Sequence, residues 1–256
     1  MIQQNVTQQG GKGAVLAGNG EANSTMAAEP RLAASVILVR DAAIPDGLEG
    51  AYALEVFVQH RVSTMDFAAG MVVFPGGRVD QVDSSGWDFA DDVAERHAAA
   101  WHRTSIAVEP SSAVLNAGRV LAAAQREVFE EAGLKLDAAT LRPWANWVTP
   151  PDQPKRFDTY FYLACPVSGA EPRHQTTEAS SSLWMPVRGI LDAEAAGTLK
   201  LMPPTLALLD ELLALGTVDA ILAQDRDVVP VRPEPGALEE FFRLRRQARS
   251  LAPELP

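Results

Sequence analysis

The chain has 256 residues, of which 47% are hydrophobic and 21% charged, a balance typical of a globular domain with a substantial core. Its formal net charge is −11, and such a surface repels a phosphate backbone, so general nucleic-acid binding is disfavoured. No apolar run approaches the roughly 18 residues that a membrane span requires. The single cysteine, Cys165, excludes an internal disulfide. These features predict a cytoplasmic protein without a membrane or nucleic-acid partner.

The first 30 residues are rich in Gln, Gly, Asn, Ser and Thr and lack the charged start and apolar centre of a signal peptide. We predict a flexible tail over residues 1–30. The pattern then changes to short β-branched or alternating runs. These runs predict strands over 34–40, 54–61 and 71–77, and the last of them ends in a proline and two glycines.

The middle of the chain has a helical pattern. Residues 78–110 carry four acids between Asp88 and Glu95 and predict one helix. From Ala113 the apolar positions step by three and four, which predicts an amphipathic helix that Gly133 caps. The remaining runs predict strands over 144–150, 157–167 and 183–187, and helices over about 188–196, 203–215, 217–225 and 236–250. Strands around one long central helix indicate a mixed α/β sandwich.

Three glutamates, Glu127, Glu130 and Glu131, fall within an arc of about 100° on the central helix. We expect them to face solvent, where their mutual repulsion costs a few tenths of a kcal/mol per pair. A divalent cation reverses this cost, because carboxylate oxygens are preferred ligands of Mg²⁺ and Mn²⁺. Arg126 lies one turn before Glu130 and can hold a carboxylate in place. The spacing alone leaves open a solvated acidic face with a surface ion pair.

The string REVFEEAGL at 126–134 resembles the second half of the Nudix box, whose pattern is Gx5Ex7REUxEExGU with U aliphatic. All five specified identities are present, and Val128 and Leu134 fill the aliphatic positions. The resemblance implies a Nudix hydrolase of the α/β class, an α/β/α sandwich with a mixed sheet. It also implies that the three glutamates bind Mg²⁺ or Mn²⁺ and that Arg126 orients them.

The first half of the box departs from the pattern, because Ser112 and Gly118 occupy the positions of its opening glycine and its earlier glutamate. A glycine loop, FPGGRVD, lies upstream at 74–80. Gly77 is therefore 50 positions before Glu127, which implies about 35 inserted residues. This interrupted box, with Asp80 and Asp83 after the loop, resembles a subgroup related to the peroxisomal coenzyme A diphosphatases. PPDQPKRFDTYFYLA at 150–164 and LMPPTLALLDEL at 201–212 resemble the same subgroup.

The resemblance predicts a Nudix domain over 31–225 with a helical insertion at about 82–109, and a C-terminal helical extension over 226–256. The insertion carries three aromatic residues at helical spacing, and we expect it to pack on the sheet as a lid or to form a dimer surface. These residues are Trp87, Phe89 and Trp101.

The function implied by the resemblance is metal-dependent hydrolysis of a pyrophosphate bond in a small-molecule nucleoside diphosphate derivative. Coenzyme A or acyl-coenzyme A is the leading substrate, and ADP-ribose, NADH or a nucleotide sugar is the alternative. RNA decapping is disfavoured by the net charge. A hypothesis of another class, motivated by Gly118, is a Nudix-fold nucleotide-binding regulatory module that does not hydrolyse its ligand. The resemblance leaves a homodimer open.

The candidate catalytic residues are Glu130, Glu131 and Arg126 of the box, together with Glu178 in the polar loop QTTEASSSLW. Either Glu131 or Glu178 could accept the proton of the attacking water. Gly76, Gly77, Arg61 and Arg156 are candidates for substrate binding, although a surface salt bridge accounts almost as well for either arginine. Trp147 and Trp184 could stack on a base, but core packing is the stronger expectation for both.

Overall fold

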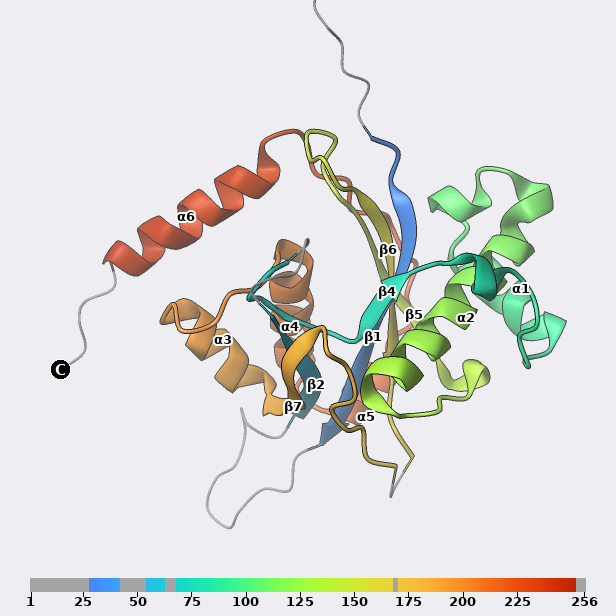
Figure 1. The fold of residues 1–256 in the computed structure, drawn as a ribbon, viewed down its shortest axis with the longest axis horizontal. Helices are drawn as coiled ribbons and strands as arrows, with labels where there is room; N and C mark the ends of the chain where they lie inside the picture. Colours follow the sequence, from blue (N-terminus) through green and yellow to red (C-terminus); the bar gives the residue numbers. More distant parts are fainter. Residues whose placement is uncertain (1–27, 42–53, 63–67, 168–169, 252–256) are drawn as a thin grey trace, which may run out of the picture.

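The computed structural model describes residues 28–41, 54–62, 68–167 and 170–251. Within these residues the fold is a mixed β-sheet with helices on both faces, which confirms the predicted α/β/α layering (Figure 1). The tail predicted over residues 1–30 lies outside the described residues, except for residues 28–30. None of the described helices is both long enough and apolar enough to cross a bilayer.

The sheet is built around β1. The main path of the sheet runs in the order β3-β2-β1-β6-β5, while β4 also pairs with β1 and β7 with β2. The β1–β6 pair is parallel, and the other strand pairs of the described sheet are antiparallel. The strands are β1 (Arg31–Asp41), β2 (Leu54–Arg61), β3 (Val72–Val73), β4 (Gly76–Arg78), β5 (Arg142–Val148), β6 (Phe157–Ala164) and β7 (Ala179–Pro186).

Alternate residues of β1 enter two separate cores. Val36 and Leu38 pack in the core on the side of the central helix, whereas Ile37 and Val39 pack in the core on the other side. Successive side chains of a strand point to opposite faces, so a strand buried on both faces needs a continuous apolar run. The run ASVILVR meets that need, and it fixes β1 as the strand between the two helical layers.

The helices form these two layers. On one face lie α1 (Asp91–Ala100) and α2 (Ala113–Ala132), and the other face is covered by α3, α4 and α5 (Figure 1). The bounds of the remaining helices are α3 (Val187–Ala195), α4 (Pro203–Leu215), α5 (Val218–Leu222) and α6 (Ala237–Leu251). The predicted helix over 217–225 is therefore shorter than expected. The strand predicted over 183–187 begins earlier, at Ala179.

Two predictions near the insertion were wrong. The segment 78–110 is not one helix, because Gly86 adopts a φ of +80° and the chain forms α1 only after it, with short 3₁₀ turns on both sides. The strand predicted over 71–77 is divided into β3 and β4. Between them the Pro75 carbonyl accepts a hydrogen bond from the Val36 N–H at 2.8 Å. At this bond the chain leaves β3, which pairs with β2, and enters β4, which pairs with β1.

The insertion packs on the sheet. Trp101 is fully buried, its ring meets the edges of Tyr160 and Tyr162, and its indole N–H donates to the Tyr162 hydroxyl at 3.3 Å. The Ser105 hydroxyl donates to the buried Asp158 carboxylate of β6 at 2.5 Å. The expected contact between insertion and sheet is therefore present, and it is both apolar and polar.

The residues after 225 return to the sheet before they form α6. Val231 exchanges backbone hydrogen bonds of 2.8 and 2.9 Å with β5, through Asn146 and Val148. Further along, Arg245 and Arg249 of α6 both donate to Glu194 of α3, whose side chain is buried. A buried carboxylate needs such partners, because an unpaired one would be strongly destabilising. These contacts attach the C-terminal helix beside α3.

Gly118 of α2 has a packing role. A Cβ placed on Gly118 would lie 2.9 Å from the Trp87 ring, which stacks on Phe89. The absence of the side chain that the box pattern expects at this position thus lets the insertion lie flat on α2.

We therefore expect Gly118→Ala to lower the free energy of unfolding by about 1–3 kcal/mol through overpacking. The same substitution in a Trp87→Ala background should cost much less, so a double-mutant cycle in urea should give a clear coupling energy. Gly189→Ala is the matched control, because its nearest new contact is 3.9 Å away. Equal costs of Gly118→Ala in the two backgrounds would contradict this interpretation.

His97 of α1 makes stability depend on pH. Its ring is buried against Tyr162, and burial, with the charge of Arg96 as a smaller cause, lowers its pKa from 6.5 to about 4. The unfolded chain therefore binds a proton below pH 6.5 that the folded chain excludes until about pH 4.

For this reason we expect His97 to remove about 2 kcal/mol from the free energy of unfolding between pH 7 and pH 5. Denaturant titrations at each pH should show a shallower pH dependence for His97→Gln than for the wild-type chain. Parallel curves for the two proteins would rule out His97 as the source.

Candidate functional site

The candidate site lies where the last turns of α2 meet β4. Gly133 ends the helix in the left-handed region, with φ +63°, and its N–H donates to the Phe129 carbonyl at 2.9 Å. The buried seam of α2 faces the sheet, so the neighbouring glutamate face is directed at the glycine loop. The helix and the loop are thus placed against each other although Gly77 and Glu127 are 50 positions apart in the chain.

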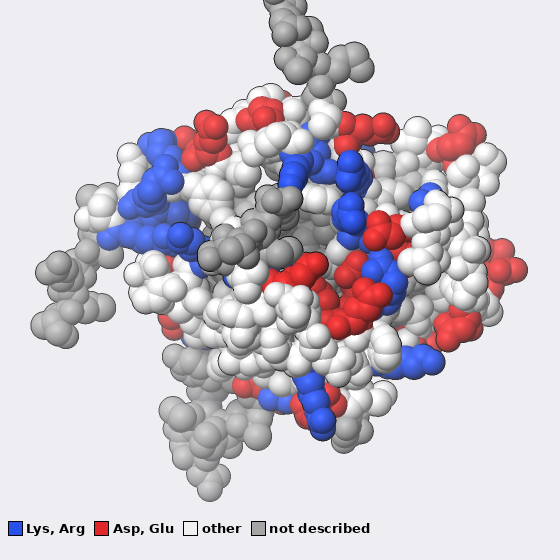
Figure 2. All heavy atoms as spheres, viewed as in Figure 1, with Lys and Arg blue, Asp and Glu red and all other residues white. Residues whose placement is uncertain are grey.

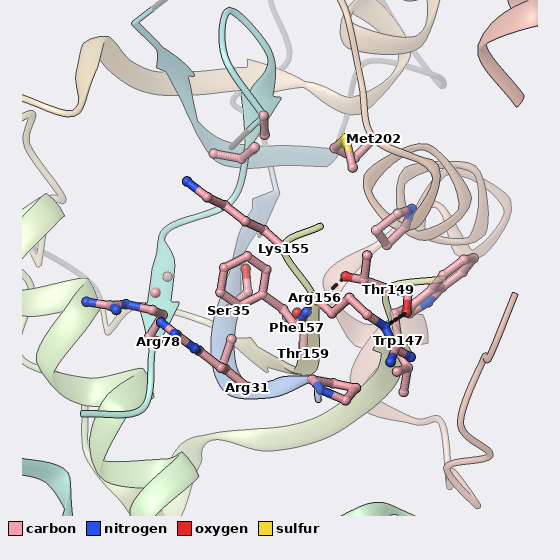
Figure 3. A pocket seen from close by; sticks show the side chains of 18 of the residues that line it. Arg31, Ser35, Arg78, Trp147, Thr149, Lys155, Arg156, Phe157, Thr159 and Met202 are labelled. Carbon is pink, nitrogen blue, oxygen red and sulfur yellow. Dashed lines mark hydrogen bonds between the residues drawn. The ribbon is translucent and has the colours of Figure 1, made fainter. Parts of the chain in front are cut away.

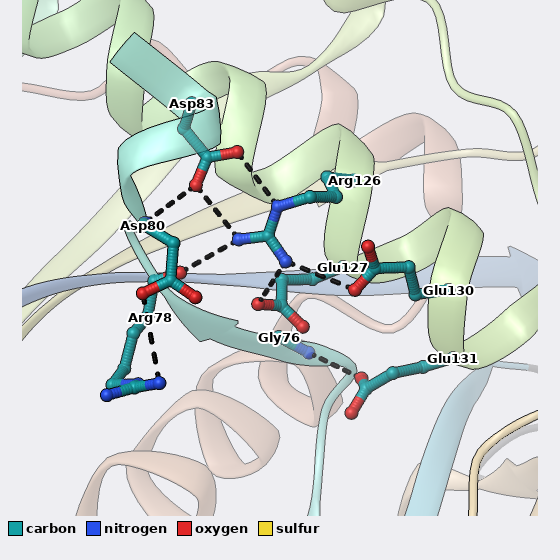
Figure 4. Close-up of polar contacts among 8 residues, drawn as sticks. All are labelled: Gly76, Arg78, Asp80, Asp83, Arg126, Glu127, Glu130 and Glu131. Atoms are coloured by element: carbon teal, nitrogen blue, oxygen red, sulfur yellow. Dashed lines mark hydrogen bonds and ion pairs between the residues drawn. The ribbon is translucent and has the colours of Figure 1, made fainter.

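Arg126 is the centre of the polar network (Figure 4). Its Nε and Nη2 donate to the two oxygens of Asp83, each at 2.9 Å, and Nη2 also donates to the Arg78 carbonyl at 3.0 Å. Its Nη1 donates to Glu127 at 2.8 Å and to Glu130 at 3.1 Å. The hydrogen bonds to Asp83 raise the pKa of Arg126 above its ordinary value. The arginine therefore stays charged and fixes two of the three glutamates.

Asp83 is a residue of this network to which the sequence assigned no role. Its side chain is only 3% exposed, and its Oδ2 also accepts the Asp80 N–H at 2.8 Å. The only signal in the sequence was its place shortly after the glycine loop. Because it lies 43 positions before Arg126, no helical spacing could connect the two residues.

The two loop glycines allow β4 to approach both β1 and the glutamates. A Cβ on Gly76 would lie 2.3 Å from the Ala34 carbonyl oxygen, and one on Gly77 would lie 2.3 Å from Glu127 Oε1. Both distances are far inside van der Waals contact, so a larger residue would force the loop away. In its present position the Gly76 N–H donates to Glu131 Oε2 at 2.9 Å.

The three glutamates differ in exposure. The side chain of Glu130 is 56% exposed, as expected, but the expectation that Glu131 faces solvent was wrong, since Glu131 is only 4% exposed beneath β4. Burial, with the charges of Glu127 and Glu178 as smaller causes, raises the pKa of Glu131 to about 7, while the Gly76 N–H and Arg61 act in the opposite direction. Burial also raises the pKa of Glu127, whereas the charge and the hydrogen bond of Arg126 lower it.

Glu178 and Arg61 come together at this site. Glu178 immediately precedes β7, and its Oε2 accepts from Arg61 Nη2 at 3.1 Å. The pairing of β2 with β7 is irregular after His60, and this irregularity brings the two side chains to the same edge. The charge of Glu178 acts on both Glu127 and Glu131, so four carboxylates share one region.

The carboxylates fit a hard divalent cation by their chemistry, because Mg²⁺ and Mn²⁺ prefer oxygen ligands. Each box glutamate keeps one oxygen outside the hydrogen bonds formed by the described residues: Oε2 of Glu127, Oε1 of Glu130 and Oε1 of Glu131. Within the described part of the chain, no three His, Cys, Asp or Glu side chains already surround one metal position. An ion would therefore draw these free oxygens together.

A cleft of about 1350 Å³ opens beside the network. Glu127, Glu130 and Glu178 line it at one end, together with Arg61 and Arg126. Figure 2 shows red side chains gathered along one side of the hollowed centre and blue ones along the other. The volume exceeds the roughly 300–1,000 Å³ of common small-molecule sites, so the cleft can hold a large ligand.

Arg156 and Trp147 line the cleft, whereas Trp184 does not. Trp184 packs edge-on against Phe57, and the Arg40 guanidinium lies 4.3 Å above its ring centroid. The structure thus places Trp184 in packing, the stronger expectation for it, and leaves Trp147 available to a ligand.

Comparisons with known proteins relate part of the chain to a family. The family model of the NUDIX domain matches residues 113–204, which include α2 and its glutamates. The chain is 27% identical over 192 residues to "Putative nudix hydrolase 7" of Caenorhabditis elegans, and the match covers 70% of this chain and 63% of that protein. The crystal structure of a NUDIX hydrolase from Alicyclobacillus acidocaldarius superposes with a TM-score of 0.59 and 26% identity, covering 80% of this chain and 99% of that one. Residues 113–204 therefore match the family that REVFEEAGL at 126–134 predicted, and the fold is similar to that of a NUDIX hydrolase.

Proposed function

We propose that this chain hydrolyses a pyrophosphate bond in a nucleoside diphosphate derivative, with Mg²⁺ or Mn²⁺ held by Glu127, Glu130 and Glu131. The observation that carries the proposal is the set of three carboxylates, each with an oxygen outside the local hydrogen bonds, of which Glu127 and Glu130 line a large cleft. A protein that only bound nucleotide would have no need to concentrate this much negative charge where phosphates must enter.

The chemistry requires a water to reach a phosphorus that negative oxygens surround. When bound, Mg²⁺ or Mn²⁺ supplies charge neutralisation and a water of lowered pKa. The chain supplies the positions: Arg126 holds Glu127 and Glu130, and the Gly76 N–H holds Glu131. These hydrogen bonds restrict the three side chains, so only a limited movement is needed to bring their free oxygens to an ion.

Glu178 is the better placed of the two candidate proton acceptors. Its side chain is 53% exposed at the cleft, so solvent water reaches it, and Arg61 orients it. Glu131 is buried and already bonded to the Gly76 N–H. We therefore assign metal binding to Glu131 and proton acceptance to Glu178.

Coenzyme A or acyl-coenzyme A is the proposed substrate. Support comes from the interrupted box and from the two stretches, 150–164 and 201–212, that resemble the coenzyme A diphosphatase subgroup. Both stretches contribute to the cleft wall, through Pro154 and Arg156 in the first and through Met202 and Pro203 in the second. ADP-ribose, NADH and nucleotide sugars share the pyrophosphate and are the alternatives.

The test is hydrolysis of coenzyme A, ADP-ribose, NADH and a nucleotide sugar with Mg²⁺, with Mn²⁺ and with EDTA, and the products are identified by mass. We expect 3′,5′-ADP and phosphopantetheine from coenzyme A only when metal is present. Glu130→Gln should lower kcat by more than about 100-fold. Loss of a metal ligand is expected to reduce activity more than loss of a residue that only orients a ligand. Glu95→Gln, an exposed acid of α1, is the control.

Turnover in EDTA, or an unchanged kcat in Glu130→Gln, would contradict the proposed chemistry. Tight nucleotide binding in EDTA with no product would instead favour the non-hydrolysing regulatory module.

The assignment of Glu178 has its own test. Glu178→Gln should lower kcat by roughly 10²–10⁴-fold, because the proton acceptor is lost. The Mg²⁺ concentration for half-maximal activity should change little, whereas Glu131→Gln should raise it. Glu171→Gln is a matched control, since Glu171 is a similarly exposed acid that pairs with Arg40. If Glu178→Gln instead changed the metal requirement without lowering kcat at saturating Mg²⁺, Glu178 would be a ligand and not the acceptor.

A further inference from the structure

The C-terminal helix α6 is fixed at its two ends to different parts of the fold. At its start, the Gly236 N–H donates at 2.8 Å to Asp152, which lies in the turn between β5 and β6. Near its end, Arg245 and Arg249 donate to the buried Glu194 of α3 at 2.9 and 2.7 Å. Figure 1 shows α6 running from the tip of the β5–β6 hairpin toward α3. The helix therefore bridges the sheet and the layer that contains α3.

One face of α6 changes from apolar to basic along its length. Leu238 and Phe241, in the first half of the helix, line the cleft. Arg245 and Arg249 follow Phe241 at steps of four residues, so they continue the same helical face, and they reach Glu194. The first half of this face is thus available to a ligand, while the second half attaches the helix.

The position of α6 depends on its ion pairs with α3. None of the described residues of α6 belongs to either hydrophobic core of the structure. The Glu194 side chain is only 1% exposed, and a carboxylate buried to this extent needs charged partners. The turn after α3 leaves room for one of them, because a Cβ on Gly197 would lie 3.1 Å from Arg249 Cδ. The chain thus provides a buried anionic site that holds α6.

The segment before α6 reaches the cleft beside Trp147. Val231 forms a parallel bridge with Trp147, which lines the cleft. In Figure 3 the side chain of Trp147 lies on one side of the pocket and that of Arg78 of β4 on the other. β4 is the strand that holds the glycine loop against the box glutamates. A ligand whose pyrophosphate lies at the carboxylates can therefore present another part of itself to α6.

We infer that α6 forms a wall of the ligand site and that Glu194 is the positioning residue that holds this wall in place. The inference rests on the proposed function, which puts the pyrophosphate at the carboxylates. Leu238 and Phe241 carry no charge, so they suit an apolar or aromatic part of the ligand that takes no part in the reaction. Such contacts are equal before and during bond cleavage, so they strengthen binding without changing the rate of the chemical step.

The kinetic test compares Glu194→Gln with Asp192→Asn, which removes an exposed carboxylate from the same helix. With coenzyme A as substrate, Glu194→Gln should raise KM about tenfold, the effect of losing a charged hydrogen bond that holds the wall. Its kcat should stay within about twofold of the wild-type value, because α6 contacts no reacting atom. Asp192→Asn should change neither constant. A role limited to folding would instead lower kcat through loss of active protein, at an unchanged KM.

Leu238→Ala and Leu244→Ala are a matched pair of substitutions in α6. Leu238 lines the cleft, whereas Leu244 is 49% exposed and does not line it. Leu238→Ala should raise KM for coenzyme A roughly fivefold, because an apolar contact with the ligand is lost, and Leu244→Ala should leave KM unchanged. In the Glu194→Gln background Leu238→Ala should add little, since the wall has already left the ligand.

The position of α6 can also be measured without turnover. Trypsin cleaves after arginine, and α6 has exposed arginines at 243 and 246. Cleavage of a folded segment follows the population of its opened form. Glu194→Gln should therefore speed cleavage within α6 about tenfold, followed by the mass of the released C-terminal peptides, and Asp192→Asn should not. Coenzyme A with Mg²⁺ should slow this cleavage in Glu130→Gln, which turns the substrate over slowly.

An unchanged KM in both Glu194→Gln and Leu238→Ala would overturn the inference, as would cleavage within α6 that Glu194→Gln does not speed. The two readouts separate the inference from the proposed function. If the wild-type chain cleaves coenzyme A and neither substitution changes KM, the wall fails and the proposed function stands. If the chain cleaves no substrate while coenzyme A still protects α6 from trypsin, and Leu238→Ala removes that protection, the proposed function fails and the wall stands.

Discussion

The Arg126 guanidinium joins what the insertion separates. It bonds Asp83 and the Arg78 carbonyl, which precede the insertion helix, and it bonds Glu127 and Glu130, which follow it. Asp83 and Glu127 are largely buried, so removing Arg126 would leave their charges uncompensated at a cost of about 3–5 kcal/mol. The two halves of the interrupted box therefore meet in space, and Arg126 contacts both of them. Asp83 lies in the first turn of the inserted segment, which means that the insertion completes the site that it interrupts.

The arginine alone could not assemble the site, because the loop must first approach the helix. Gly76 and Gly77 have no side chain where one would meet Ala34 and Glu127. Gly118 likewise has no side chain at the place where the Trp87 ring lies. Glycines therefore allow both the loop and the insertion to pack closely on α2. The close approach explains the burial of Glu131 and its raised pKa. Charge and packing are thus coupled: burial raises the pKa of Glu127 and of Glu131, and Arg126 and the Gly76 N–H respectively oppose that rise.

The sequence predicted the features that depend on residues close together in the chain, and it missed those that depend on contacts between distant segments. The helical seam of α2, its glutamate face and Gly133 are local patterns, and the continuous apolar run of β1 can likewise be read from its own residues. The single helix expected over 78–110 failed because one glycine in the left-handed region outweighed the apolar spacing around it. The role of Asp83, the burial of Glu131 and the approach of Glu178 to the box depend on strand pairing between distant segments. No periodicity in the chain encodes those contacts, so only the structure could reveal them.

An acidic protein repels an anionic ligand, but in this cleft the acidic and the basic side chains lie in different places. One end concentrates carboxylates, which repel phosphate unless a divalent ion intervenes, so entry of a pyrophosphate there depends on metal. Elsewhere the cleft wall carries Arg156, whose guanidinium the Thr149 and Ala28 carbonyls hold in place, so its attraction for anions needs no metal. A ligand that reaches both places is oriented before any chemistry begins. Orientation of this kind lowers the entropic part of the barrier and would let the same carboxylate network act on one bond of a large, flexible molecule.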